Sequence, residues 1–258
     1  MSSDSFPGSA PGNAVGMAAF ERDGFLLRPA FLSADEVAEC LLQLERYIAD
    51  VVPGLSPEEV FYEERENPET LKQLQSMHVH DRWFGDFFGG RVRQLAEELL
   101  SGEVVGRNMQ FFNKPPGIGR PTPPHQDGYY FKIDPPSAVT MWLALDEADE
   151  DNGCVRYVKA SHRKGMRPHT LTDTLGFSQE ISDFGTSEDE ENEVAVTAAP
   201  GDLLAHHALT IHRADRNCSA RRNRRALGCI FYSVEAMEDL AAEADYRRQL
   251  AGQQRGRI

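Results

Sequence analysis

Long apolar runs are missing from this sequence, and no stretch approaches the roughly 20 apolar residues that a membrane-spanning helix needs. Residues 1–16 are rich in Ser, Gly and Pro, and they have neither the basic start nor the apolar core of a secretory signal peptide. We therefore expect a disordered leader over these residues and no association with a membrane.

Cysteine is also scarce. The four cysteines are Cys40, Cys154, Cys218 and Cys229. Their positions lack the paired spacing of a disulfide framework or a zinc ribbon, so both kinds of small stabilised fold are excluded. Isolated cysteines of this kind favour a cytoplasmic location, where thiols stay reduced.

Positive charge is in short supply, with 27 Lys and Arg against 41 Asp and Glu and a formal net charge of −14. Nucleic acids and anionic membranes bind basic surfaces because their phosphates are negatively charged. The composition therefore argues against both partners and favours a small-molecule substrate. For the same reason a small polar substrate is favoured over a coenzyme A thioester, while no pattern indicates the oligomeric state.

The first third of the chain carries helix signals. Residues Ser33 to Glu36 form a capping box, in which the serine hydroxyl accepts a backbone N–H and the glutamate reaches back. Apolar residues then recur at three- and four-residue steps, which predicts an amphipathic helix that ends before Pro53. Pro57 and Pro68 look like first-turn prolines of further helices, so we expect residues 17–102 to be mostly helical.

From residue 103 the pattern changes to short apolar strands separated by Gly and Pro. Such segments span residues 104–113, 125–131, 139–145, 154–159, 194–198, 203–208 and 226–233. Strands without intervening helices favour a mainly β fold, with a double-stranded β-helix (jelly-roll or cupin-like) core over residues 103–234 and the N-terminal helices packed on one sheet. We expect a single domain over residues 17–258 that ends in a helix at 235–255, on the surface or at an interface.

Two loops are distinctive. Residues 149–153 end in Asn-Gly, which predicts a hairpin turn. Residues 163–193 are polar and acidic, and a loop of this length in a compact domain is usually a lid or a disordered insertion.

His125 and Asp127 have side chains that bind divalent metals. If both lie on the strand predicted at 125–131, its two-residue period places their side chains on one face. A third ligand must come from elsewhere, and the candidates in one later segment are His206, His207 and His212. Two histidines and one carboxylate leave one side of a metal open, as in non-haem Fe(II) oxygenases. A Zn(II) hydrolase or isomerase with the same ligands, or a non-catalytic jelly-roll binding module, are the alternatives.

Several motifs occur in a definite order along the chain. They are Phe20-Glu21-Arg22-Asp23-Gly24-Phe25, Asn113-Lys114-Pro115-Pro116-Gly117, His125-Gln126-Asp127, Trp142-Leu143-Ala144-Leu145-Asp146, Asn152-Gly153-Cys154, Ala160-Ser161-His162, and Gly201-Asp202 followed by His212. Together, over residues 20 to about 233, their order and spacing resemble the phytanoyl-CoA dioxygenase family of Fe(II)- and 2-oxoglutarate-dependent oxygenases. The resemblance implies a jelly-roll core and an enzyme that uses Fe(II), 2-oxoglutarate and O2 to hydroxylate an unactivated C–H bond.

By this resemblance the iron ligands are His125, Asp127 and His212. The family's distal histidine follows Gly-Asp and precedes an Asn-x-Ser, matched here by Asn217-Cys218-Ser219. The earlier histidines at 206 and 207 sit at the wrong register for this pattern. Relatives that chlorinate have a small residue at the position of the carboxylate, so Asp127 favours hydroxylation over halogenation.

The family also has an arginine that anchors 2-oxoglutarate, and the Arg-Arg-Ala at the start of the last strand matches it with Arg224. The spacing from His212 is one residue longer than usual, which leaves Arg225 as the alternative, and the serine often found two residues after the histidine is Ala214. Gln110 and Trp142 match positions that line the cosubstrate pocket.

The substrate pocket is less clearly marked. Its candidate residues are Tyr129, Phe131, Lys132 and Arg156. An acyl-CoA, an amino-acid-like solute, an alkylphosphonate and an intermediate of a secondary pathway all remain open as substrates.

Overall fold

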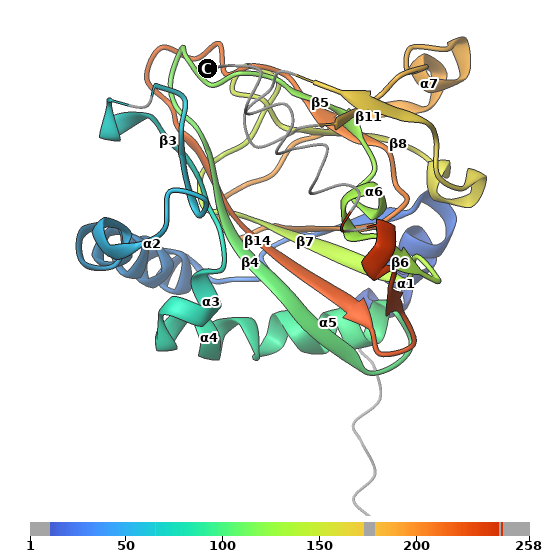
Figure 1. Cartoon of the computed structure of the whole chain (residues 1–258), viewed down its shortest axis with the longest axis horizontal. Coiled ribbons are helices and arrows are strands. Elements are labelled where there is room, and N and C mark those ends of the chain that lie inside the picture. The colour runs from blue at the N-terminus through green and yellow to red at the C-terminus, as the bar shows by residue number, and fades with distance from the viewer. Residues whose placement is uncertain (1–10, 65, 173–178, 243, 245–258) are drawn as a thin grey trace, which may run out of the picture.

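The structure is a computed structural model that describes residues 11–64, 66–172, 179–242 and 244. Two antiparallel sheets form its centre, and helices cover the outer face of the larger sheet (Figure 1). This is the predicted mainly β architecture with a jelly-roll core and N-terminal helices on one sheet. Among the described residues, no helix has the length and apolar character needed to cross a membrane.

The larger sheet has seven strands. Their order is β1 (Phe25–Arg28), β12 (Leu203–His207), β7 (Ala138–Ala144), β14 (Arg224–Ser233), β4 (Val104–Lys114), β3 (Leu71–Leu74) and β2 (Val60–Tyr62). Side chains alternate between the two faces of a strand. On β14, Leu227 and Phe231 therefore face the helices, while Arg224 and Ile230 line an internal cavity.

The smaller sheet lies across the inner face of the larger one. Its order is β11 (Glu193–Val196), β8 (Val155–Val158), β13 (His212–Ala214) and β5 (Thr122–His125). Phe25 of β1 stacks on Tyr157 of β8 with ring centroids 4.4 Å apart, and both belong to an apolar cluster that also contains Trp142 and Leu204. Two members of this cluster, Trp142 and Val155, also line the cavity between the sheets.

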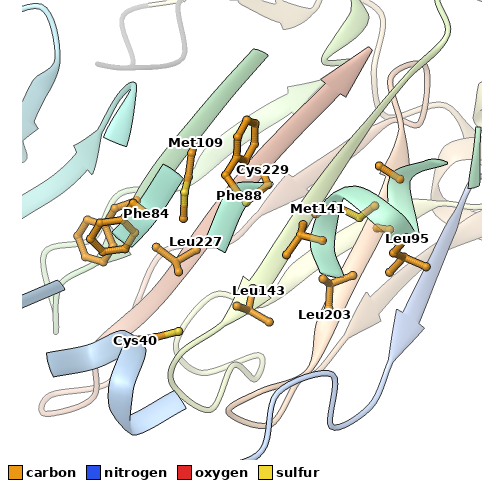
Figure 2. Close-up of a cluster of buried hydrophobic side chains, with 14 of the residues drawn as sticks. Cys40, Phe84, Phe88, Leu95, Met109, Met141, Leu143, Leu203, Leu227 and Cys229 are labelled. Carbon is orange, nitrogen blue, oxygen red and sulfur yellow. The ribbon is translucent and has the colours of Figure 1, made fainter. Parts of the chain in front are cut away.

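The helices bury their apolar faces against the outer face of the larger sheet. They are α1 (Pro11–Asp23), α2 (Ala34–Asp50), α3 (Met77–His80), α4 (Arg82–Phe88) and α5 (Arg91–Leu99). Figure 2 shows Cys40, Phe84 and Leu95 of this layer directed at the sheet. The predicted capping box is present at the start of α2, where the Glu36 N–H donates to the Ser33 hydroxyl and the Ser33 N–H donates to the Glu36 carboxylate.

Short elements connect these layers. They are the 3-10 helices at Val52–Gly54, Pro68–Thr70 and Ser161–Lys164, together with α6 (Gly128–Phe131), β6 (Ile133–Asp134), β9 (His169–Leu171), β10 (Gln179–Ile181), α7 (Ser187–Asn192) and β15 (Met237–Glu238). β9 pairs with β10 and β6 pairs with β15. The described part of the predicted lid at 163–193 therefore contains a small sheet and a helix, and residues 173–178 lie outside the description.

The expectation that residues 17–102 are mostly helical is wrong in one part. Pro57 opens a turn, and Pro68 starts only a single 3-10 turn. The adjoining segments form β2 and β3, which extend the larger sheet because the edge of β4 offers unpaired backbone groups. This long-range pairing outweighs the local helix signal of proline.

The predicted ends of the domain also need correction. α1 begins at Pro11, so residues 11–16 are helical, and residues 1–10 lie outside the described chain. At the other end residues 237–238 form β15 where a helix is expected, and most of the remaining predicted helix, up to 255, lies outside the description.

The hairpin predicted at residues 149–153 and the strand predicted at residues 125–131 differ from the structure. Residues 149–153 form a turn, but the flanking β7 and β8 belong to different sheets, because both edges of β7 are already paired, with β12 and β14. The segment 125–131 leaves the sheet after His125 and forms α6.

The packing of the helix layer on β14 yields a stability prediction. Leu227 is fully buried in this layer, so Leu227→Ala removes buried methyl groups and leaves a cavity. We expect the free energy of unfolding to fall by about 2–5 kcal/mol in chemical denaturation. Leu42→Ala on α2 is the control, because Leu42 is 59% exposed and its loss should change stability by less than about 0.5 kcal/mol. Equal effects of the two substitutions would contradict this account of the core.

Candidate active site

Three metal-binding side chains meet at the junction of β5, β13 and α6. His125 is the last residue of β5 and pairs in register with His212, the first residue of β13. Asp127 has a helical backbone conformation, with φ −57° and ψ −35°, and stands at the start of α6. The Gly128 N–H donates to the Ala208 carbonyl at 2.8 Å and fixes the turn that brings Asp127 back toward the histidines.

The geometry of these three residues suits a shared metal ion. The Nε2 atom of His125 lies 3.5 Å from Asp127 Oδ1, and that of His212 lies 3.7 Å from the same oxygen. One ligand atom from each residue can be chosen so that all three lie within 4.8 Å of one another. A single ion can therefore contact all three, and no fourth side chain in the described chain joins the set.

Backbone carbonyls fix the orientation of both histidines. Nδ1 of His125 is 2.8 Å from the Pro123 carbonyl oxygen, and Nδ1 of His212 is 3.0 Å from that of Thr210. A carbonyl only accepts, so each Nδ1 carries the proton and each Nε2 presents a lone pair toward the site. Burial, with the neighbouring histidines adding to it, holds the pKa of His212 well below its ordinary value, which keeps this imidazole neutral and able to bind a metal.

The second oxygen of Asp127 is held away from the histidine pair. The Thr140 hydroxyl donates to Oδ2 at 2.6 Å, and His206 Nε2 donates to it at 3.1 Å. The Tyr157 hydroxyl lies 3.0 Å from His206 Nδ1, and burial raises the pKa of Tyr157 well above its ordinary value, so the hydroxyl stays a donor. This chain of donors leaves Oδ1 free for a metal.

The charge state of Asp127 follows from the same contacts. Burial by itself would raise its pKa, but the hydrogen bonds that the carboxylate accepts, including that from His206, stabilise its charged form and hold the pKa well below its ordinary value. The carboxylate is therefore ionised, as a metal ligand must be.

The two histidines that the sequence pattern sets aside have different places. His206 contacts Asp127 as described, whereas His207 lies on the other face of β12 near Phe20 and His162. Burial lowers the pKa of His207 to about 4, and its Nδ1 accepts the Leu209 N–H. His207 thus belongs to the scaffold.

A cavity of about 550 Å³ opens from these three residues between the two sheets. Its walls include Phe112, Trp142 and Ile230 from the larger sheet and Val155 from the smaller one. The volume is in the range of small-molecule sites, which are mainly apolar with a few placed polar groups.

One end of the cavity gathers buried cations. Arg224 lies across the ring of Trp142, with its guanidinium carbon 5.2 Å from the ring centroid, and its Nε has no hydrogen-bond partner among the described residues. Burial lowers the pKa of Arg224 to about 10. Burial, together with the charges of Arg224 and Lys72, also holds the pKa of Lys114 well below its ordinary value. Glu63 pairs with Lys72 at 3.3 Å, so Arg224 is the buried cation that has no carboxylate partner among the described residues and can bind an anion.

Arg225 faces the opposite side of β14. It donates to both oxygens of Asp146, at 2.9 and 2.8 Å, and does not line the cavity. The sequence motif matches Arg224 and leaves Arg225 as the alternative. Of these two arginines, Arg224 is the one that can reach a ligand in the cavity.

Amide side chains line the wall on the other side of the metal ligands. Gln110 and Asn108 both donate to Gln75 Oε1, at 2.8 and 2.7 Å. All three line the cavity, as does Trp142.

Of the four residues predicted to bind the substrate, only one lines the cavity. Phe131 lines the cavity, whereas Tyr129 stacks on His169 with ring centroids 4.2 Å apart and Lys132 sits over the Tyr129 ring. Arg156 points away from the cavity and forms ion pairs with carboxylates that include Asp215.

Several residues of the site were missed by sequence reasoning. Lys114 lies within the Asn113–Gly117 motif, so its signal was available, whereas Thr140, Lys72 and Gln75 belong to none of the motifs. Other motif residues are structural: Asn217 Nδ2 donates to the carbonyls of Lys114 and Arg222 at 2.7 Å and ties the end of β4 to the loop before β14.

Comparison with known proteins gives consistent results. The chain is 30% identical over 145 residues to phytanoyl-CoA dioxygenase 1 of Oryza sativa subsp. japonica, covering 56% of this chain and 51% of that protein. It is 28% identical over 208 residues to a probable alpha-ketoglutarate-dependent hypophosphite dioxygenase of Stutzerimonas stutzeri, covering 78% and 72%. The match thus spans about half the length of the rice relative.

A solved structure shares the fold. The epimerase SnoN in complex with Fe3+, alpha ketoglutarate and nogalamycin RO superposes with a TM-score of 0.70 at 22% identity, over 88% of this chain and 86% of that one. The family model described as phytanoyl-CoA dioxygenase matches residues 20–226, which include all three metal-binding side chains and Arg224. This chain is a member of the phytanoyl-CoA dioxygenase family.

Proposed function

We propose that this protein is an Fe(II)- and 2-oxoglutarate-dependent dioxygenase that hydroxylates a C–H bond of a small molecule. The carrying observation is that two imidazoles and one carboxylate line a cavity that also contains a buried arginine. His125, Asp127 and His212 would hold the iron, and Arg224 would anchor 2-oxoglutarate. 

The donor set supports iron. Two imidazole nitrogens and one carboxylate oxygen on one side of an ion leave positions open, whereas structural zinc sites are closed by four ligands. Bound Fe(II) supplies the redox chemistry that couples decarboxylation of 2-oxoglutarate to succinate and CO2 with hydroxylation by O2. The Nδ1 hydrogen bonds and the Thr140 hydroxyl hold the ligands in place, and the apolar walls exclude water from the reacting groups.

The cation-rich end supports a dicarboxylate cosubstrate. The planar fork of Arg224 matches a carboxylate with two parallel hydrogen bonds. Trp142 under the guanidinium restricts its orientation. A Zn(II) hydrolase or isomerase would leave this buried arginine without a role, which disfavours that alternative.

The free cysteines and the net charge bear on the compartment and the partners. Cys40, Cys154, Cys218 and Cys229 are all free thiols, which supports a reducing cytoplasm. We propose a small-molecule substrate and neither nucleic acid nor membrane as partner, in keeping with the net charge of −14.

Anaerobic titration tests the proposed function. We expect Fe(II) and 2-oxoglutarate together, but neither alone, to produce a weak visible charge-transfer band in the purified protein, because the keto acid must bind the metal directly. A protein that binds zinc but shows no band with Fe(II) and 2-oxoglutarate would overturn the oxygenase and favour a hydrolase or a binding module.

The arginine assignment has its own test. Arg224→Gln removes the buried cation, and we expect the dissociation constant of 2-oxoglutarate to rise about 10- to 100-fold, because a hydrogen bond to a charged group contributes about 1.5–3 kcal/mol. Arg225→Gln is the matched control, since Arg225 pairs with Asp146 outside the cavity. An unchanged constant for Arg224→Gln, or a larger rise for Arg225→Gln, would reverse the assignment.

The contact between Thr140 and Asp127 should matter for metal affinity. Thr140→Val keeps the side-chain shape and removes the 2.6 Å hydrogen bond, so we expect Fe(II) to bind about 10-fold more weakly. Thr140→Ser keeps the hydroxyl and should retain most of the affinity. Metal titration of the three proteins checks this, and equal losses in the valine and serine variants would assign the effect to packing.

A further inference from the structure

A β-bulge in β4 turns Arg107 into the cavity. The residues of β14 that pair with Asn108 and Gly106 are consecutive, so Arg107 has no partner in the register. Bulges re-aim side chains next to active sites, and here both Arg107 and Asn108 line the cavity. Gly106 approaches the helix layer, where an added Cβ would lie 2.4 Å from the ring of Phe88. The bulge thus presents an arginine to the cavity without disturbing the core.

Arg107 marks the end of the cavity opposite Arg224. The two arginines sit near opposite ends of the β4–β14 ladder, with Gln110 between them, and the metal ligands line the same cavity. The Arg107 guanidinium lies over the ring of Tyr232, 5.0 Å from its centroid, and forms an ion pair with Glu238. Figure 1 shows the dark red strand β15, which carries Glu238, alongside β6 at this end of the structure.

The ion pair is accessible and easily exchanged. The side chains of Arg107 and Glu238 are 38% and 36% exposed, and ion pairs at such positions contribute little stability. Among the described residues that line the cavity, the only carboxylates are Glu238 and Asp127. The Asp127 carboxylate is committed to the metal site, so Glu238 is the carboxylate that neutralises Arg107 when no ligand is present.

We propose that Arg107 binds a carboxylate group of the substrate, which displaces Glu238 from the guanidinium. The substrate is then a small carboxylic acid whose charged group lies at the Arg107 end of the cavity while its reacting carbon lies at the metal ligands. This inference rests on the proposed function, because it takes the metal centre as the place of reaction. Tyr232 beneath the guanidinium orients the fork toward the incoming carboxylate.

Butyrate and its uncharged analogue butyramide are suitable probes. The protein is loaded with Fe(II) and 2-oxoglutarate without oxygen, so that the Arg224 end is filled, and dissociation constants are taken from the rise in melting temperature at low salt. We expect Glu238→Gln to bind butyrate about threefold more tightly than wild type, because the competing carboxylate is gone. Arg107→Gln should bind butyrate at least about tenfold more weakly, and butyramide should not distinguish the variants.

Arg91→Gln is the matched control. Arg91 also pairs with a glutamate, Glu36, and lies over an aromatic ring, that of Phe31, but outside this cavity. Its substitution should leave butyrate binding unchanged. The inference would be overturned if Arg107→Gln bound butyrate as tightly as wild type. It would also be overturned if Glu238→Gln did not bind butyrate more tightly than wild type. This second result still tests the inference if Arg107→Gln fails to fold. The charge-transfer band tests the proposed function separately. If the band were missing while the butyrate dissociation constants were as expected, the oxygenase function would be refuted but the carboxylate-binding site would not.

Discussion

The backbone pairing of His212 with His125 is the constraint on which the site depends. It fixes two imidazoles side by side on the smaller sheet, at positions 87 residues apart in sequence. Because the chain leaves β5 immediately after His125, Asp127 can turn toward both rings instead of lying beside them on a strand. The Pro123 carbonyl on β5, the Thr210 carbonyl just before β13 and the Thr140 hydroxyl of the opposite sheet then orient the ligands, so the metal centre forms only when the two sheets close on each other.

Much of the fold was predictable because it rests on local signals: the capping box at Ser33, the apolar period of α2, and the short strands after residue 103. The ligand set was predictable because motif order carries family information, although the strand geometry assumed for Asp127 was wrong. What failed depends on long-range pairing, such as β2 and β3 joining the edge of β4. The contacts of Thr140 and Lys72 could likewise not be predicted, because the identity of a single residue on a strand does not indicate which side chain lies opposite it.

Net charge proved a poor guide to the interior. The chain carries a net −14, yet the cavity gathers Lys72, Lys114, Arg107 and Arg224. The amino-acid composition determines the electrostatic potential far from the molecule, where the acidic surface residues dominate. A buried guanidinium instead acts over a few ångströms in a medium of low polarity. The argument from composition against phosphate-rich ligands therefore holds for large surfaces and says little about an anion small enough to enter the cavity.

The position of the bulge in β4 bears on how such a scaffold changes over time. Arg107 lies outside the regular ladder, and its partner Glu238 belongs to a strand of only two residues, whereas Arg224 and the two histidine ligands are built into long-range pairings. Substitutions or small insertions around Arg107 can alter which molecule is accepted while the oxidising centre is preserved. One framework can in this way diversify in specificity with little risk to its chemistry.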